Sequence, residues 1–306
     1  MSIVVEQPGL FTTVQDCGRW GYQRYGVPVA GAMDMPSHRL ANTLVGNSPG
    51  AASLEITLMG PELLFEAATT FAVTGADFDV RLDATAVESN TTWVGDSGQR
   101  LAFGARRRGV RAYLSVAGGF ETDLVFGSRA THVPSRMGGI GGRPLERGDR
   151  LDVGKSRQTM RAGTHRSAIT ALPGDGARVR VIMTASTDPP QIEQQQRLER
   201  SRFWVAAESN RMGYRLEGSR LTTAEGSSTI SSAVTLGAVQ VPPDGLPIVL
   251  MADHQTSGGY PHVATVISAD IAILGQLMAS NWIEFEVCTQ EDALRALVAQ
   301  ERVLVA

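Results

Sequence analysis

The sequence predicts a mainly β protein with a few short helices, divided into two β domains. Short runs of β-forming residues recur along the whole chain, Gly, Pro, Asp or Asn closes most of them, and few segments have helical character. A chain of 306 residues has the length of about two domains. Because few helices separate the strands, the sheets are not expected to consist of βαβ units, which excludes a dinucleotide-binding fold.

Eight segments have the composition and length of β-strands, since each is a short run rich in β-branched, aromatic or other apolar residues. They are residues 2–5, 54–58, 62–65, 70–74, 111–116, 178–183, 248–251 and 282–287. The arginines at 106–108 precede one of these strands and are expected to form a solvated hairpin, with contact to an anion or a partner as the less favoured alternative.

Helices are expected over residues 35–45, 191–196 and 291–299. In the first of them Asp34 stands at the N-cap position. The second is glutamine-rich and polar enough to lie on the surface. In the third, Thr289 and Asp292 form a capping box ahead of an apolar helix face.

The join between the two domains is expected in residues 154–176, which are poor in large apolar residues and rich in Arg, Ser, Thr and Gly. This gives one domain over residues 1–165 and another over residues 166–306. The pattern R-x-G-Y occurs at 19–22 and at 211–214. It is compatible with two copies of one barrel carrying equivalent loops, and equally with chance.

Composition and charge exclude several classes of partner. The chain has 28 basic and 31 acidic residues and a net charge of −3, so no broad basic surface is available for nucleic acid. Its cysteines, Cys17 and Cys288, form neither a disulfide framework nor a metal-ligand spacing, and no metal site is assigned. Because no signal peptide or membrane-spanning run is recognised, we expect a cytoplasmic protein without membrane or nucleic-acid partners.

Two polar, glycine-rich stretches, residues 15–34 and 237–261, carry more hydrogen-bonding groups than loops require. They combine carboxylates, an imidazole, amides and hydroxyls, which are the groups of a site for a small polar substrate. Each residue also has a structural alternative: Asp34 as a helix cap, Asp253 and Thr256 as turn residues, and His254 as a structural histidine. Residues 148–156 are not a phosphate-binding loop, because five residues separate the two glycines where the loop needs four.

Sequence blocks in one consistent order run along nearly the whole chain. They are GLFTTVQD at 9–16, GVP at 26–28, GAMD at 31–34, LAN at 40–42, LVGN at 44–47, TGAD at 74–77, VAGG at 116–119, GSR at 127–129, RMGYRL at 211–216, QVP at 240–242 and GGYP at 258–261. In these blocks the sequence resembles the allophanate hydrolase subunit 2 family. This biotin-dependent carboxyltransferase-like family includes the Kip-type antagonist of a sporulation regulator and the C subunit of bacterial 5-oxoprolinase.

The resemblance implies two cyclophilin-like β-barrel domains and a heteromer with a companion subunit 1. For 5-oxoprolinase it implies a third protein and ATP, with Mg, bound at the level of the complex, to open the lactam of 5-oxoproline to glutamate. We therefore expect a subunit of ATP-dependent 5-oxoprolinase, a hydrolase active only as part of that complex on a small-molecule amide. No biotin is expected to be attached to this chain, since Lys155 is its one lysine and follows glycine instead of methionine.

Under this interpretation the candidate catalytic residues are Asp34, Asp253 and His254. The candidate substrate-binding residues are Gln15, Arg19, Tyr22, Arg211, Tyr214, Gln240, Gln255, Thr256 and Tyr260. The two arginines are expected to neutralise a phosphate or carboxylate, one aspartate to act as base or metal ligand, and the remaining side chains to orient the ring. His254 stands where the family often has arginine, which leaves the identity of the substrate open.

Two other functions stay open from the sequence. The chain could be a carboxyltransferase subunit that moves a carboxyl group from carboxybiotin on another protein to urea or a related small amide. It could also be a non-catalytic regulator that binds the companion subunit and antagonises its inhibition of a histidine kinase.

Overall fold

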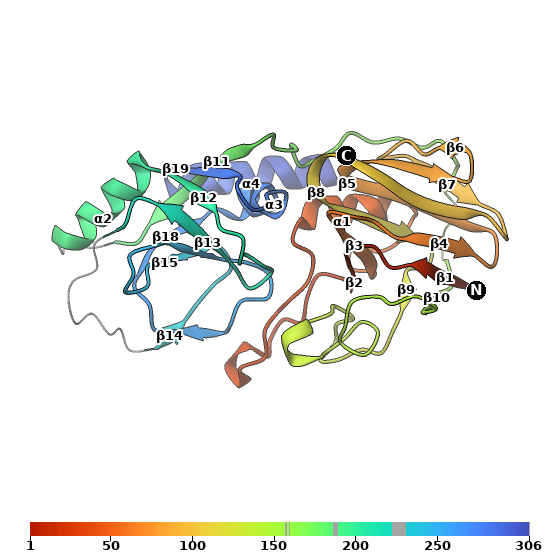
Figure 1. The fold of residues 1–306 in the computed structure, drawn as a ribbon, viewed down its shortest axis with the longest axis horizontal. Helices are drawn as coiled ribbons and strands as arrows, with labels where there is room; N and C mark the ends of the chain where they lie inside the picture. Colours follow the sequence, from red (N-terminus) through yellow and green to blue (C-terminus); the bar gives the residue numbers. More distant parts are fainter. Residues whose placement is uncertain (157, 159, 186–188, 222–230, 306) are drawn as a thin grey trace. The chain divides into compact units, whose positions relative to one another are not determined.

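The computed structural model describes residues 1–156, 158, 160–185, 189–221 and 231–305. The chain forms two compact units (Figure 1). The first comprises Met1–Trp20 and Ala30–Leu172, and the second comprises Gly21–Val29 and Pro173–Ala306. The border after Leu172 falls inside the segment in which the sequence places the join, whereas the inclusion of residues 21–29 in the second unit is a feature that the sequence did not indicate.

The first unit contains one sheet of ten strands. The strands are β1 (Ser2–Gln7), β2 (Phe11–Gln15), β3 (Ser53–Thr57), β4 (Glu62–Phe65), β5 (Thr69–Leu82), β6 (Thr85–Ala86), β7 (Thr92–Gly95), β8 (Arg100–Val116), β9 (Phe120–Glu121) and β10 (Arg150–Val153). The main path runs β2-β3-β8-β4-β1-β10-β9, and β5 pairs with β6, β7 and β8. Phe65 and Phe71 stack in the core of this unit with ring centroids 5.4 Å apart.

The long antiparallel pair β5 and β8 corrects the prediction for the arginines at 106–108. These arginines lie within β8 and do not form a hairpin turn. Arg107 faces acidic side chains of β5, 3.6 Å from Asp77 and 3.5 Å from Asp79. The predicted strand is too short because its continuation is charged and the pairing shifts register after Gly75, a pattern typical of β-bulges.

The helix of the first unit, α1 (Met35–Leu44), begins where the sequence predicts. The Asp34 carboxylate accepts a hydrogen bond from the backbone N–H of Ser37 at 3.0 Å, which satisfies a donor that the first turn leaves free. A short 3-10 helix, η2 (Val133–Ser135), lies later in the same unit, and η1 (Gln23–Tyr25) lies in the segment that belongs to the second unit.

The second unit is built around a closed barrel with the strand order β11-β18-β15-β16-β13-β12-β19. These strands are β11 (Gly176–Met183), β12 (Arg202–Val205), β13 (Gly213–Gly218), β15 (Ala238–Gln240), β16 (Ile248–Leu250), β18 (His262–Val266) and β19 (Trp282–Val287). A two-stranded ladder joins β14 (Ser232–Ala233) to β17 (Ser257–Gly258). The helical segments are α2 (Pro189–Arg200), η3 (Ser268–Asp270), α3 (Ile271–Gly275) and α4 (Gln290–Val305).

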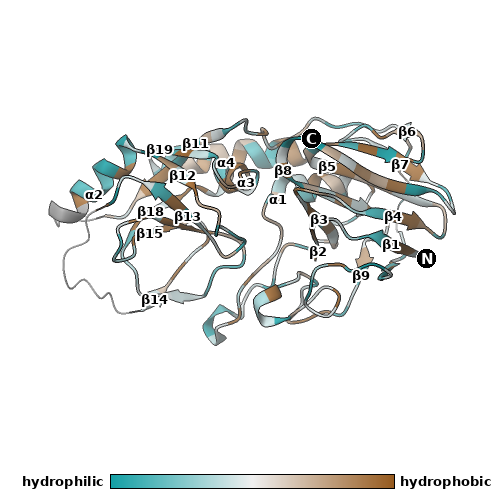
Figure 2. Cartoon of the chain, in the orientation of Figure 1, coloured by the Kyte–Doolittle hydropathy of each residue, from teal (hydrophilic) through white to brown (hydrophobic). Residues whose placement is uncertain are grey.

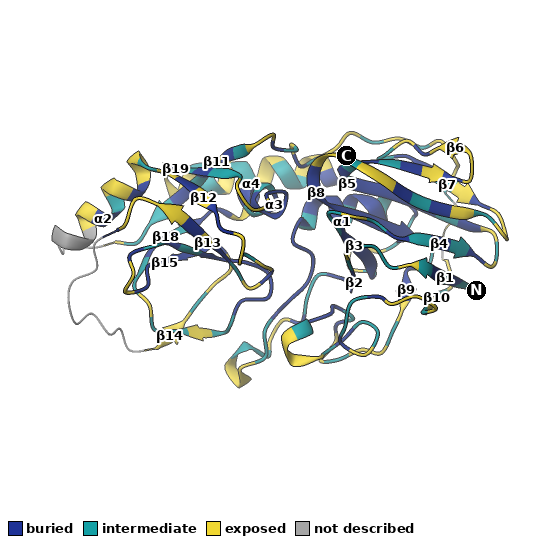
Figure 3. Ribbon diagram, viewed as in Figure 1, coloured by how far each residue is buried: buried dark blue, intermediate teal, exposed yellow. Residues whose placement is uncertain are grey.

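Alternation along the barrel strands separates an inner apolar face from an outer face. Phe203 of β12 and Phe285 of β19 meet inside the barrel with ring centroids 5.9 Å apart. Strands β15 and β18 are largely hydrophobic in Figure 2 and largely buried in Figure 3, whereas α2 exposes much of its surface. The protein is therefore mainly β, with two barrel-like sheets and few helices, as the sequence predicts.

The two R-x-G-Y segments do not occupy equivalent positions. Residues 19–22 lie in the coil and turn after β2, and the border between the two units divides them. In the second occurrence Gly213 and Tyr214 open the barrel strand β13. The repeat therefore does not mark equivalent loops of two barrels. Among the helices of the described ranges, none has the length and apolar character needed to cross a bilayer.

Candidate functional site

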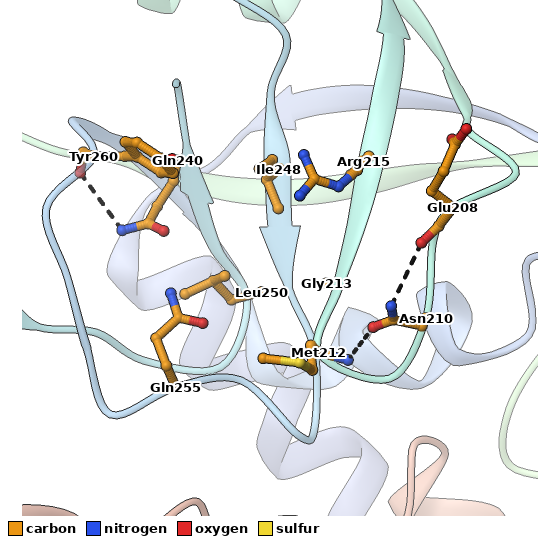
Figure 4. A pocket seen from close by; sticks show the side chains of 10 residues that line it. All are labelled: Glu208, Asn210, Met212, Gly213, Arg215, Gln240, Ile248, Leu250, Gln255 and Tyr260. Atoms are coloured by element: carbon orange, nitrogen blue, oxygen red, sulfur yellow. Dashed lines mark hydrogen bonds between the residues drawn. The ribbon is translucent and has the colours of Figure 1, made fainter. Parts of the chain in front are cut away.

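A cavity of about 230 Å³ lies on the outer face of the second barrel (Figure 4). Its floor comes from three neighbouring strands, in which Arg215 of β13 pairs with Ile248 of β16 and Ile248 pairs with Gln240 of β15. Residues paired across strands point to the same face of a sheet. The cavity is lined by Glu208, Asn210, Met212, Gly213, Arg215, Gln240, Ile248, Leu250, Gln255 and Tyr260.

The intervening residues of the same strands point into the barrel. Tyr214 and Val239 both pair with Val249, and all three side chains are buried. The Tyr214 hydroxyl donates a hydrogen bond to the carbonyl oxygen of Leu277 at 3.1 Å. Tyr214, a predicted substrate-binding residue, therefore does not line the cavity.

Two carboxamide side chains converge on one side of the cavity. Gln240 is almost fully buried, and its Nε2 lies 3.5 Å from the carbonyl oxygen of Tyr260 (Figure 4). A Cβ at Gly258 would stand 2.9 Å from Nε2 of Gln240 and 3.3 Å from Nε2 of Gln255. The missing side chain at Gly258 thus lets both amides meet beside the backbone. Each carboxamide offers a donor and an acceptor, so the pair can hold another amide group.

Arg211 and Asp253 form a buried ion pair next to the cavity. The guanidinium Nε and NH2 each lie 2.9 Å from a carboxylate oxygen, and both side chains are less than a tenth exposed. The backbone N–H of Asp253 also donates to the carbonyl of Arg211 at 2.8 Å. This bidentate pair fastens the loop that carries Gln255 and Tyr260 to the segment that carries Met212. Neither charged group lines the cavity.

His254 and Thr256 flank Gln255 in this loop. Burial lowers the pKa of His254 below its usual value, although a hydrogen bond to the backbone and the Asp253 carboxylate oppose the effect. Its Nδ1 lies 2.5 Å from the carbonyl oxygen of Gln255. The imidazole is therefore neutral near pH 7. Thr256 is half-buried and accepts a backbone hydrogen bond from Val234 at 3.2 Å; neither residue lines the cavity.

Several cavity residues were not expected from the sequence, and among them Glu208 and Arg215 carry opposite charges. Both side chains are exposed at the rim. In Figure 4 the Arg215 guanidinium lies over Ile248 and points toward Gln240, away from Glu208. The alternation of side chains along a strand could have indicated Arg215. Because Tyr214 points into the barrel, the next residue of the strand has to face outward.

Asp34, a predicted catalytic residue of the first unit, is fully buried. Besides the backbone of Ser37, its carboxylate accepts hydrogen bonds from the Ser37 hydroxyl and from the Thr170 hydroxyl, both at 2.8 Å. These contacts make Asp34 a helix cap in a buried polar network. The catalytic role assigned to it from the sequence stays a prediction.

Tyr113 and Glu55 extend this network, although neither residue was expected from the sequence to have a role. The Tyr113 hydroxyl donates to the Glu55 carboxylate and accepts from the backbone N–H of Asp34, both at 2.7 Å. Arg111 Nε lies 3.7 Å from the other oxygen of Glu55. Burial, followed by the two carboxylates, raises the pKa of Tyr113 well above its usual value. The network thus keeps a protonated phenol between two acidic side chains.

The other predicted site residues near the N-terminus also lie outside the cavity. Gln15 is fully buried and donates to the Thr13 hydroxyl at 3.0 Å and to the Thr131 carbonyl at 3.1 Å. Arg19 is buried in the first unit and donates to the carbonyl oxygens of two backbone residues, Val125 and Ala130. Tyr22 is half-buried, and its carbonyl accepts from the backbone N–H of Tyr25 at 2.9 Å.

The structure therefore brings Gln240, Gln255 and Tyr260 together at one cavity, with Arg211 and Asp253 beside it. Within the described residues, no group of three or more His, Cys, Asp or Glu side chains could hold a metal ion. Residues 148–154 form a turn that leads into β10 and then a strand end, without a following helix. These residues do not fit a nucleotide phosphate or its metal.

Comparison with known proteins identifies relatives along the full chain. A family described as "Carboxyltransferase domain, subdomain A and B" matches residues 25–287. The chain is 41% identical to the 5-oxoprolinase C subunit of Escherichia coli K12, over 96% of this chain and 94% of the relative, and 36% identical to that of Haemophilus influenzae, over 92% and 90%. The crystal structure of the K. lactis urea amidolyase superposes with a TM-score of 0.91 at 30% identity, covering 99% of this chain and 20% of that larger protein.

Proposed function

This chain belongs to the carboxyltransferase domain family, and from that premise we propose that it is a subunit of an ATP-dependent 5-oxoprolinase. The similarity to the C subunit of bacterial 5-oxoprolinases over almost the full length of both chains carries the proposal. In this role the chain works in a heteromer with a companion subunit 1 and a third protein, and the complex hydrolyses the 5-oxoproline lactam to glutamate.

The cavity on the second barrel is the proposed binding site of the lactam. Gln240 and Gln255 present donors and acceptors side by side, which suits the N–H and C=O of a cyclic amide. Ile248 and Leu250 supply an apolar floor for the ring carbons, and Tyr260 closes one edge. A cavity of about 230 Å³ has room for a ring of this size.

The ion pair of Arg211 and Asp253 acts on the substrate through the loop that it fastens. Both residues are therefore proposed as positioning residues, in place of the direct contacts expected from the sequence. His254, neutral and buried behind Gln255, fixes the carbonyl of that residue. Any proton transfer by Asp34 or His254 stays a prediction.

An amide carbonyl is a poor electrophile, so opening the lactam with water requires activation. ATP, with Mg, would supply a phosphoryl group for this purpose and would be bound elsewhere in the complex. The described residues of this chain contribute the amide-binding cavity and the exclusion of water from its buried side, where Gln240 lies. Because the substrate and ATP would bind to different subunits, one chain alone would be inactive.

The direct test is co-expression of this chain with the companion subunit and the third protein, followed by measurement of glutamate formed from 5-oxoproline. We expect glutamate only when ATP and all proteins are present. Omission of this chain serves as the control. An intact complex that forms no glutamate with ATP would contradict the proposal.

Carboxyl transfer to urea is the second candidate, favoured by the structural similarity to the urea amidolyase. It would need a separate biotin-carrying protein, because the one lysine, Lys155, follows Gly154. The two functions differ in their response to avidin, which blocks biotin. Urea-dependent ATP hydrolysis that avidin abolishes would favour carboxyl transfer, whereas avidin-resistant glutamate formation would favour 5-oxoprolinase.

A further inference from the structure

Arg215 is the basic residue of the cavity, and no counter-ion accompanies it within the described ranges. The other arginines of the barrel strands have acidic partners, which are Glu284 for Arg178 and Arg202, and Asp270 for Arg180. An unpaired guanidinium at a cavity is free to bind an anionic group of a ligand, and its planar fork suits a carboxylate.

The sheet places Arg215 and Gln240 at opposite ends of one row. Both pair in register with Ile248, so their Cβ atoms are two strand spacings apart, which is roughly 10 Å. In Figure 4 the Arg215 guanidinium points across Ile248 toward Gln240, and the Nε2 of Gln240 faces the carbonyl oxygen of Tyr260. The span of the row, from the guanidinium at one end to the carboxamide at the other, suits a ligand of a few heavy atoms.

We propose that Arg215 anchors the carboxylate of the substrate, while Gln240 and Gln255 hold its amide. This inference rests on the proposed function and narrows its substrate class to small amides or lactams that carry a carboxylate, which excludes uncharged amides such as urea. Glu208, on the far side of Arg215, disfavours a carboxylate there and so orients the ligand toward Gln240. The sequence predicts that Arg19 and Arg211 contact the carboxylate, but both of these side chains donate to groups of the protein. We therefore assign the carboxylate contact to Arg215.

The test measures KM and kcat for 5-oxoproline in the reconstituted complex with wild-type chain, Arg215→Gln, Arg215→Lys and the control Arg178→Gln. Arg178 is an exposed arginine of the same barrel outside the cavity. Loss of a charge-assisted bidentate contact should raise KM about tenfold to a hundredfold in Arg215→Gln with kcat within about twofold. Arg215→Lys keeps the charge but lacks the planar guanidinium, so its KM should lie between the values of wild type and Arg215→Gln. The KM of Arg178→Gln should match that of wild type.

The uncharged ring 2-pyrrolidinone isolates the carboxylate contribution, because it keeps the lactam and lacks the carboxylate. Its inhibition constant should be equal in wild type and Arg215→Gln. The inference is overturned if KM for 5-oxoproline changes no more in Arg215→Gln than in Arg178→Gln. It is also overturned if Arg215→Gln weakens the binding of 2-pyrrolidinone by the same factor as it raises KM for 5-oxoproline.

Failure of the proposed function is distinguishable from failure of this inference. If the wild-type complex forms no glutamate, calorimetric titration of the same complexes with 5-oxoproline and 2-pyrrolidinone replaces the kinetics. Loss of 5-oxoproline binding in Arg215→Gln alone would then support the anchor. Equal binding to all variants, or none to wild type, would overturn it.

Discussion

At the scale of single residues, His38 links the stability of the first unit to pH. The imidazole is fully buried, 2.7 Å from the Ser53 hydroxyl, and burial lowers its pKa from 6.5 to about 4. The carboxylates of Asp16 and Glu55 oppose that shift only in part. The unfolded chain therefore binds this proton more tightly than the folded chain. The contribution of the neutral imidazole to the free energy of unfolding is fully present above pH 6.5 and is lost as the pH drops toward 4, by about 3 kcal/mol in total.

The prediction is tested by urea unfolding of wild type and His38→Gln between pH 7 and pH 4.5. Wild type should lose stability more steeply with acid than the variant, although the variant starts lower at pH 7 because it loses packing. His165→Gln, at an exposed histidine, is the control and should retain the wild-type slope. Equal slopes in wild type and His38→Gln would show that His38 does not cause the acid sensitivity.

Gly258 is the residue on which the shape of the cavity depends. In Gly258→Ala the new methyl group would displace the flexible amide ends of Gln240 and Gln255 and leave the backbone in place. We expect KM for 5-oxoproline to rise about tenfold while the melting temperature stays within about 2 °C of wild type. Gly174→Ala is the matched control, since its Cβ would meet no atom within 4 Å. Comparable KM values for the two variants would contradict this account of the cavity.

At the scale of structural elements, the Arg211–Asp253 pair joins the β16–β17 loop to the segment before β13. Asp253→Ala should lower the free energy of unfolding by about 3 kcal/mol, because it removes the acidic partner of a buried guanidinium. The double variant Arg211→Met, Asp253→Leu should recover much of that loss. Denaturant unfolding of the three proteins tests the effect. If Asp253→Ala abolished activity without loss of stability, a direct chemical role would replace the positioning role.

A capping box stabilises the N-terminus of α4. The Thr289 hydroxyl accepts from the backbone N–H of Asp292 at 3.1 Å, and the Asp292 carboxylate accepts from the hydroxyl and the backbone N–H of Thr289. Thr289→Ala should cost about 1 kcal/mol of stability, and Thr289→Ser should retain most of it. Thermal unfolding distinguishes the two. Equal losses in both variants would show that the hydroxyl is not the stabilising group.

The elements that the sequence predicts well are those with their own local signals. The bounds of β4 and β19 match the prediction, and α1 begins after its cap and ends one residue early. By contrast, β5 and β8 extend through charged residues that only pairing with each other stabilises. The short α3 escapes prediction because five residues are too few to show a helical period.

The candidate site shows the same division between local and long-range information. The density of polar groups in residues 253–260 indicates Gln255 and Tyr260, and the structure places both at the cavity. The placement of Arg215 at the cavity could not be predicted from the sequence, because it depends on which face of β13 is buried. A shift of one residue in the strand register would exchange the faces of Arg215 and Tyr214. The burial of Arg19 and Asp34 likewise follows from contacts with residues about a hundred or more positions away, Ala130 and Thr170.

At the scale of the whole molecule, the two units carry different polar assemblies. The first contains a closed network around Tyr113, whose members are all buried. The second contains an open cavity with unequal ends, two carboxamides on one side and a guanidinium on the other. The second arrangement can bind a small ligand, and the proposed substrate site therefore lies on the second barrel.

The measurement that tests this assignment most directly is glutamate formation by the reconstituted complex carrying Gln240→Leu and Gln255→Leu together. Both substitutions keep the side-chain volume and remove the amide. We expect kcat/KM to fall by at least about 100-fold, equivalent to roughly 2.7 kcal/mol, in a complex that still assembles. Gln300→Leu, on α4 of the same unit, should retain wild-type activity. Wild-type activity in the double variant would show that the lactam binds elsewhere.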